Sequence, residues 1–162
     1  MKVIRNYLYN IGYQVLAIIV PLITSAYVSR VLRPEGVGAN AFTNSIIQYF
    51  ILFASMGIGY YGNRQIAYVR DNRTKMAKTF WEIQIVKTIM TLVSIIAFEI
   101  FLIFYTRQFD YMLAKSLNLI AVAFDISWFY EGVENFKVTV LKNSLVKIVS
   151  MIAIFVFIKG PY

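Results

Sequence analysis

The chain has 162 residues, of which 59% are hydrophobic and 15% charged, with a formal net charge of +8 and a mean hydropathy of +0.64. A soluble domain averages about 45–50% apolar and about 25% charged residues, so this composition excludes a disordered or nucleic-acid-binding tail and indicates a membrane protein. Cysteine and histidine are absent, which excludes disulfides, zinc–thiolate centres, Ser–His–Asp triads and Cys–His dyads.

Five apolar runs follow one another along the chain. The first, residues 6–29, has no charge and is long enough to cross roughly 30 Å of hydrocarbon at about 1.5 Å per residue. A turn predicted at residues 33–38 separates it from the second run, residues 36–63, which ends in a glycine-rich segment. Three further runs, each carrying some charge, cover residues 79–105, 112–130 and 143–158. The pattern predicts an all-α, polytopic transmembrane helix bundle of about five spans.

The cationic residues predict the orientation of this bundle. With the N-terminus in the cytoplasm, the segments on that side hold ten Lys and Arg residues, against five on the other side. The most cationic of these segments is the loop at residues 64–78. The positive-inside rule therefore favours a cytoplasmic N-terminus, and the same loops can contact anionic membrane lipid.

Polar residues within the runs recur at helical spacing. A charged group at the bilayer centre costs roughly 2.5–3.5 kcal/mol, so such residues are expected to face the bundle interior or a wet cavity. Each run carries one polar or small stripe. Examples are Gln84, Lys87, Thr91 and Ser94 in the third run, Asn118, Asp125, Trp128 and Gly132 in the fourth, and Asn44, Gln48, Ser55, Gly59 and Gly62 in the second.

These stripes have a structural interpretation beside a functional one. Hydrogen bonds between helices are the more common use of the amides and hydroxyls, and close helix packing is the more common use of the glycines. Lys87 and Asp125 are open to both interpretations, because their opposite charges allow a structural ion pair between the third and fourth spans. Arg30 and Arg64 are expected chiefly to set the topology.

Five stretches of the chain resemble one known family, the oligosaccharide flippases that move O-antigen or capsule repeat units. This family belongs to the multidrug/oligosaccharidyl-lipid/polysaccharide exporter superfamily. The resembling stretches are residues 19–38, 43–53, 57–67, 78–83 and 125–140, and Arg33 stands where the family more usually has glycine before Pro-Glu-Gly. The resemblance implies two helical bundles, of roughly a dozen or more spans together, around a cavity that opens alternately to either side. We therefore expect residues 1–162 to form the first bundle of a longer transporter, with the missing C-terminal helices as its partner.

The function implied by the resemblance is transport, without catalytic residues, cofactor or metal. The expected substrate is an undecaprenyl-diphosphate-linked oligosaccharide, which would cross the cytoplasmic membrane. Lys87 and Arg64 are the expected contacts of the diphosphate, with Arg30 at the outer mouth. Asp125 would couple transport to a cation or pair with Lys87. The expected contacts of the sugar are Asn44, Gln48, Asn118 and Trp128.

Three alternatives stay open at this stage. The first is a drug or toxin exporter of the same superfamily, which would need acidic cavity walls for cationic drugs. The second is a membrane-embedded glycosyltransferase or polymerase using Glu131 and Glu134. The third is a nonfunctional remnant of a broken gene.

Overall fold

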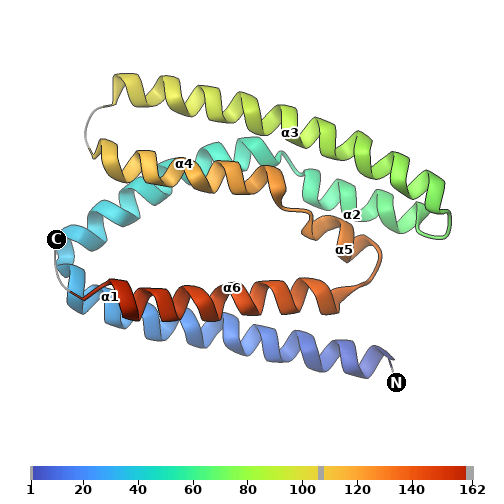
Figure 1. Cartoon of the computed structure of the whole chain (residues 1–162), viewed down its shortest axis with the longest axis horizontal. Helices are drawn as coiled ribbons and strands as arrows, with labels where there is room; N and C mark the ends of the chain where they lie inside the picture. Colours follow the sequence, from blue (N-terminus) through green and yellow to red (C-terminus); the bar gives the residue numbers. More distant parts are fainter. Residues whose placement is uncertain (1, 106–107, 160–162) are drawn as a thin grey trace. The chain divides into compact units, whose positions relative to one another are not determined.

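A computed structural model describes residues 2–105 and 108–159, and within them the chain is helical apart from short joints and contains no strand (Figure 1). The predicted all-α polytopic class is thereby confirmed. The helices are α1 (Lys2–Ser55), α2 (Ile58–Val69), α3 (Arg73–Phe104), α4 (Phe109–Phe124), α5 (Ser127–Gly132) and α6 (Phe136–Phe157).

Within the described residues, four helical segments are long and apolar enough to cross a membrane. They are Gln14–Val69, Arg73–Phe104, Phe109–Gly132 and Lys137–Phe157. The first has 56 residues, more than twice the roughly 20 that one crossing needs, and it contains the second predicted span and most of the first. The other three coincide with the remaining predicted spans. The chain is a multi-pass membrane protein.

The turn predicted at residues 33–38 is confined to a single residue. Helix α1 continues through this region and departs from helical geometry only at Arg33, with φ 60° and ψ 170°. Proline disfavours the helical conformation in the residue before it, yet it fits well at the first position of a helix. Pro34 therefore interrupts the helix at Arg33 and starts it again, and the following glycines do not break it.

The chain divides into two compact units, and α1 contributes to both. The first unit contains the residues up to Gly38 together with those from Asn135 onward. Inside it, the first part of α1 lies beside α6 (Figure 1). The Tyr27 hydroxyl donates a hydrogen bond of 2.7 Å to the carbonyl of Ile158, and the Tyr27 ring lies 4.6 Å from that of Phe155.

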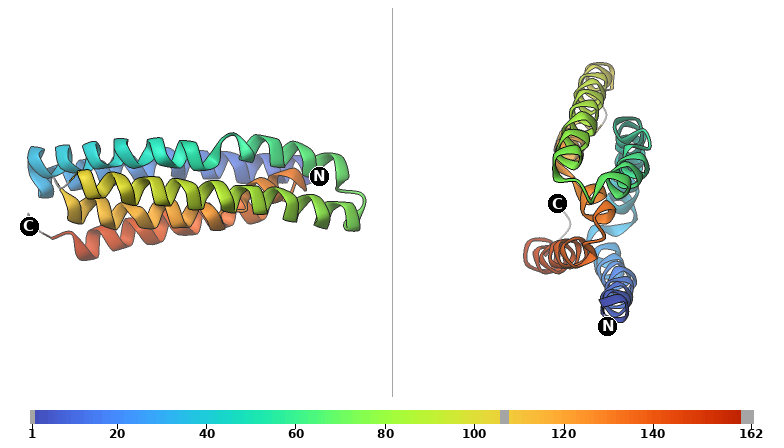
Figure 2. Two further views of the ribbon diagram at one scale, coloured as in Figure 1. Left: turned by 90° about the horizontal axis from the view of Figure 1, so that it is seen from above. Right: turned by 90° about the vertical axis from the view of Figure 1, so that its right-hand side faces the viewer.

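The second unit, Ala39–Glu134, contains the main apolar core. Helices α3 and α4 run antiparallel and side by side in it (Figures 1 and 2). The stripe predicted on the third span is confirmed, because Lys87, Thr91 and Ser94 are all buried. Ser94 also ties α3 to α1 through a hydrogen bond of 2.7 Å from its hydroxyl to the carbonyl of Phe50. The buried core residues are Ile47, Ala54, Phe98, Leu102, Met112 and Leu119.

Two glycines bring α2 and α5 into close contact in the same unit. A Cβ at Gly62 would lie 2.5 Å from the ring of Trp128, and a Cβ at Gly132 would lie 2.7 Å from Ile66. Neither position has room for a methyl group. The packing role expected of the glycines is confirmed at these two positions, and their contact fixes where Trp128 sits.

Candidate functional site

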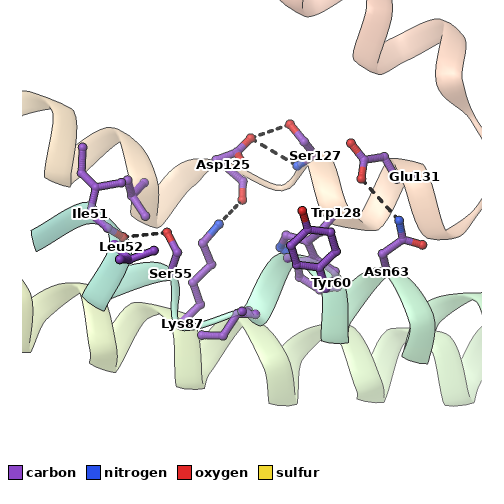
Figure 3. Close-up of a pocket in the computed structure, with 14 residues that line it drawn as sticks. Ile51, Leu52, Ser55, Tyr60, Asn63, Lys87, Asp125, Ser127, Trp128 and Glu131 are labelled. Carbon is purple, nitrogen blue, oxygen red and sulfur yellow. Dashed lines mark hydrogen bonds between the residues drawn. The ribbon is translucent and has the colours of Figure 1, made fainter. Parts of the chain in front are cut away.

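Two helix breaks of the second unit meet at one cavity of about 560 Å³ (Figure 3). The first break lies between α1 and α2, where Met56 and Gly57 have φ of 34° and 72°. The second lies between α4 and α5, at Asp125 and Ile126. Broken helices at membrane depth are tolerated where the freed main-chain groups are covered by protein or line a wet cavity. The cavity is therefore a candidate binding site.

Helix α3 supplies the side chains that cover the end of α4. Lys87 is only 5% exposed, and its ammonium group donates a hydrogen bond to the main-chain carbonyl of Asp125 (Figure 3). One turn earlier, Gln84 donates through Nε2 to the carbonyl of Ala123, at 2.8 Å. The last carbonyls of a helix lack helical donors and carry partial negative charge. Lys87 and Gln84 thus cap α4 from the neighbouring helix.

The Asp125 side chain forms hydrogen bonds on the α5 side of the break. Its Oδ1 atom accepts hydrogen bonds from the main-chain nitrogen of Ser127 at 3.3 Å and from the Ser127 hydroxyl at 2.6 Å. The carboxylate therefore lies at the start of α5. The structure brings Lys87 and Asp125 together, as the sequence suggested, and the hydrogen bond from Lys87 goes to the main chain of Asp125.

The remaining wall of the cavity mixes polar and aromatic groups. Asn63 donates to Glu131 Oε2 at 3.3 Å. Tyr60 lines the cavity and is 91% exposed. Trp128 also lines it but is 3% exposed, and Phe80 stacks on it with ring centroids 5.5 Å apart. A stacked sugar needs an open ring face, which Trp128 does not offer. The expected contact between Trp128 and a sugar stays a prediction.

Asn44 and Gln48 lie at a second cavity of about 530 Å³ on α1. This cavity shares three lining residues with the first. Asn44 accepts a hydrogen bond of 3.3 Å from Lys115, which also donates to Asn40 at 2.9 Å. Lys115 therefore links α4 to α1 through these two hydrogen bonds. The shared lining residues are Ile51, Leu52 and Ser55.

Three expected contacts lie away from both cavities. Asn118 is exposed on α4. Arg64 is exposed on α2, where its Nε atom donates to the Tyr68 hydroxyl at 3.3 Å. Arg30 is exposed in the first unit. The second unit therefore brings Lys87, Asp125 and Trp128 to one cavity, and Asn44 and Gln48 to the next.

Glu131 and Glu134, the acidic pair considered for an enzyme, contact two different residues. Glu131 accepts from Asn63 inside the cavity, whereas Glu134 forms an ion pair of 2.5 Å with Arg70. The hydrogen bond to Glu134, and secondarily its negative charge, raises the pKa of Arg70 above its ordinary value. The two carboxylates thus have separate partners.

Sequence reasoning missed Tyr60, Asn63 and Glu131 as cavity residues. Residues 57–62 did carry a signal, because three glycines in six residues predict irregular or closely packed backbone. No comparable signal marks the break at Asp125, where the sequence has neither glycine nor proline. This break is set by contacts with α3.

Comparison with known proteins agrees with the membrane architecture. A family profile described as "Polysaccharide biosynthesis protein" matches residues 3–162. Over 157 residues the chain is 24% identical to a protein of Escherichia coli (strain K12) named "Putative O-antigen transporter". That match covers 95% of this chain and 38% of the relative, so the chain spans less than half of the relative's length. No solved structure matches. The chain belongs to the polysaccharide biosynthesis protein family.

Proposed function

We propose that this chain is part of a flippase that carries an undecaprenyl-diphosphate-linked oligosaccharide across the cytoplasmic membrane for surface polysaccharide synthesis. The observation that carries the proposal is the cavity at two helix breaks, with Lys87 inside it, in a member of this family. Discontinuous helices are where many transporters place their substrate sites. The relative's name points to O-antigen transport by that protein.

The physical problem for such a transporter is to move sugar hydroxyls and a diphosphate through hydrocarbon. A cavity lined by amides, hydroxyls and ions replaces the water that these groups lose. We propose Arg64 and Arg30 as contacts of the diphosphate outside the cavity, and Lys87 as the cation of the cavity itself. The proposed partner is the set of helices that completes the transporter beyond this chain. Transport alone makes or breaks no bond, so the proposal assigns no catalytic residue.

The test is translocation of a lipid-linked oligosaccharide in proteoliposomes containing the complete transporter. We expect Lys87→Ala to reduce the rate at least tenfold, because it removes both the cavity's cation and the cap of α4. Arg64→Ala should give a smaller loss. Arg73→Ala, which removes an exposed charge at the start of α3, is the matched control and should transport normally. Unchanged translocation in the Lys87→Ala plus Arg64→Ala double variant would remove both residues from the mechanism.

The two carboxylates in the cavity favour one second candidate, a drug or toxin exporter. Asp125 and Glu131 both line the cavity, where they would attract a cationic drug. The same proteoliposomes distinguish the two functions. Efflux of ethidium that is lost in Asp125→Asn and Glu131→Gln, without any movement of lipid-linked oligosaccharide, would establish the exporter instead.

A further inference from the structure

The charges lining the cavity disfavour a phosphate group as its occupant. One ammonium group, of Lys87, faces the cavity together with the carboxylates of Asp125 and Glu131. Lys87 already donates to the carbonyl of Asp125. A diphosphate placed there would meet two like charges in a medium of low dielectric constant. A neutral ligand would not be repelled by these carboxylates. A neutral ligand rich in hydroxyl groups could also use both carboxylates as hydrogen-bond acceptors.

The indole N–H of Trp128 is a hydrogen-bond donor that has no acceptor within the described part of the chain. Its indole Nε1 atom is buried, and no described residue accepts a hydrogen bond from it. Figure 3 draws this nitrogen on the side of the ring toward Lys87. Roughly 90% or more of buried polar groups have a partner, so an unpaired one on a cavity wall calls for an explanation. An acceptor atom of a ligand would satisfy it.

The other groups around Trp128 complete a set suited to hydroxyls. Glu131 accepts one hydrogen bond from Asn63, and a carboxylate can accept about four. The Oδ1 atom of Asn63 is a further acceptor. Tyr60 exposes almost its whole ring on the same wall, which provides a flat apolar surface beside these polar atoms. The volume of about 560 Å³ lies within the ~300–1,000 Å³ typical of small-molecule sites.

We propose that this cavity is the sugar subsite of the transporter. A neutral, hydroxylated ring accepts a hydrogen bond from Trp128 Nε1–H, donates to Glu131, and packs against Tyr60. Trp128 therefore contacts the sugar with its edge and not with its face, and Lys87 acts as a positioning residue through the joint that it caps. The proposal rests on the proposed flippase function and narrows that function. The cavity binds the sugar, and cations outside the cavity bind the diphosphate.

The two tryptophans of the chain make the test direct. In Trp81→Phe, which removes the exposed indole of α3, Trp128 becomes the sole tryptophan and its emission reports on the cavity. The 162-residue chain in lipid nanodiscs is titrated separately with methyl glycosides of glucose, galactose, N-acetylglucosamine and rhamnose, and with sodium pyrophosphate. We expect at least one glycoside to shift the emission saturably and pyrophosphate to leave it unchanged. An emission shift with pyrophosphate alone, or an emission that none of the four glycosides changes, overturns the proposal.

Variants then assign the contacts by calorimetric titration with the responding glycoside. We expect Trp128→Phe, which keeps an aromatic ring against Phe80 but lacks the N–H, to bind about tenfold more weakly. Glu131→Gln should weaken binding similarly, whereas Glu134→Gln, outside the cavity, should bind as the parent does. Helicity by circular dichroism shows that each variant is folded. Undiminished binding in both Trp128→Phe and Glu131→Gln overturns the assignment.

This experiment and the translocation assay fail independently. Glycoside binding without flipping of the lipid-linked oligosaccharide would refute the flippase function and keep the site. Flipping without glycoside binding would refute the sugar subsite and keep the function.

Discussion

At the scale of single residues, Arg33 occupies a backbone conformation that favours glycine. A φ of 60° with a ψ of 170° lies in a region that is costly for any residue with a Cβ atom. The strain therefore has a simple physical cause, a side chain held where the chain must turn ahead of Pro34.

Arg33→Gly is expected to stabilise the protein by roughly 1–3 kcal/mol, because it relieves this strain. Reversible unfolding in mixed detergent micelles measures the difference. Arg30→Gly, at a regular position in the same helix, is the control and should destabilise by about 1 kcal/mol. Equal effects of the two substitutions would show that Arg33 is not strained.

The contact between Gly62 and Trp128 gives a second prediction at this scale. A methyl group at Gly62 would lie 2.5 Å from the indole ring, so Gly62→Ala is expected to destabilise by roughly 1–3 kcal/mol. Gly59→Ala is the matched control in the same helix, because nothing lies within 4 Å of its Cβ. Better helix propensity should make the control neutral or slightly stabilising. Thermal unfolding followed by circular dichroism measures the two melting temperatures. Equal melting temperatures of the two variants would contradict this prediction.

At the scale of elements, the sequence predicted which helix faces are buried better than it predicted where the helices break. The buried stripe of α3 follows from helical spacing alone, because Lys87, Thr91 and Ser94 recur every three or four residues. The break after Phe124 could not be predicted in this way, since its carbonyls are held by side chains 38 or 39 residues away in sequence. The same holds for Tyr60 and Glu131, which become neighbours of one cavity only once α2 packs on α5.

The joint between α4 and α5 is expected to depend on its cap. Lys87→Met keeps an apolar stem of similar length but leaves the Asp125 carbonyl without this donor, at a cost of about 1–3 kcal/mol. Hydrogen exchange measures the local effect, and amides at Ser127 and Trp128 should exchange faster than in the parent. Lys78→Met is the control, because its ion pair with Glu82 is exposed and worth at most about 1 kcal/mol. Unaltered exchange at the joint in Lys87→Met would mean that the break holds without its cap.

At the scale of the whole molecule, charge and length together predict the orientation in the membrane. Helix α3 has 32 residues, or about 48 Å at 1.5 Å per residue, so it is long enough for its two ends to lie on opposite sides of a membrane. The segment at its start is the most cationic of the chain. The positive-inside rule therefore predicts that this segment faces the cytoplasm, and the same rule predicts a cytoplasmic N-terminus.

Because the sequence contains no cysteine, single-cysteine variants report this orientation without background labelling. Lys75→Cys, in the first turn of α3, is expected to react with a membrane-impermeant maleimide only after the cells are permeabilised. Asp110→Cys, in the first turn of α4 and therefore beyond the far end of α3, should react in intact cells. The opposite pattern would place the cationic segment outside and invert the topology. Labelling of both positions in intact cells would show that α3 does not cross the membrane, and the cavity at Lys87 could then not serve passage from one leaflet to the other.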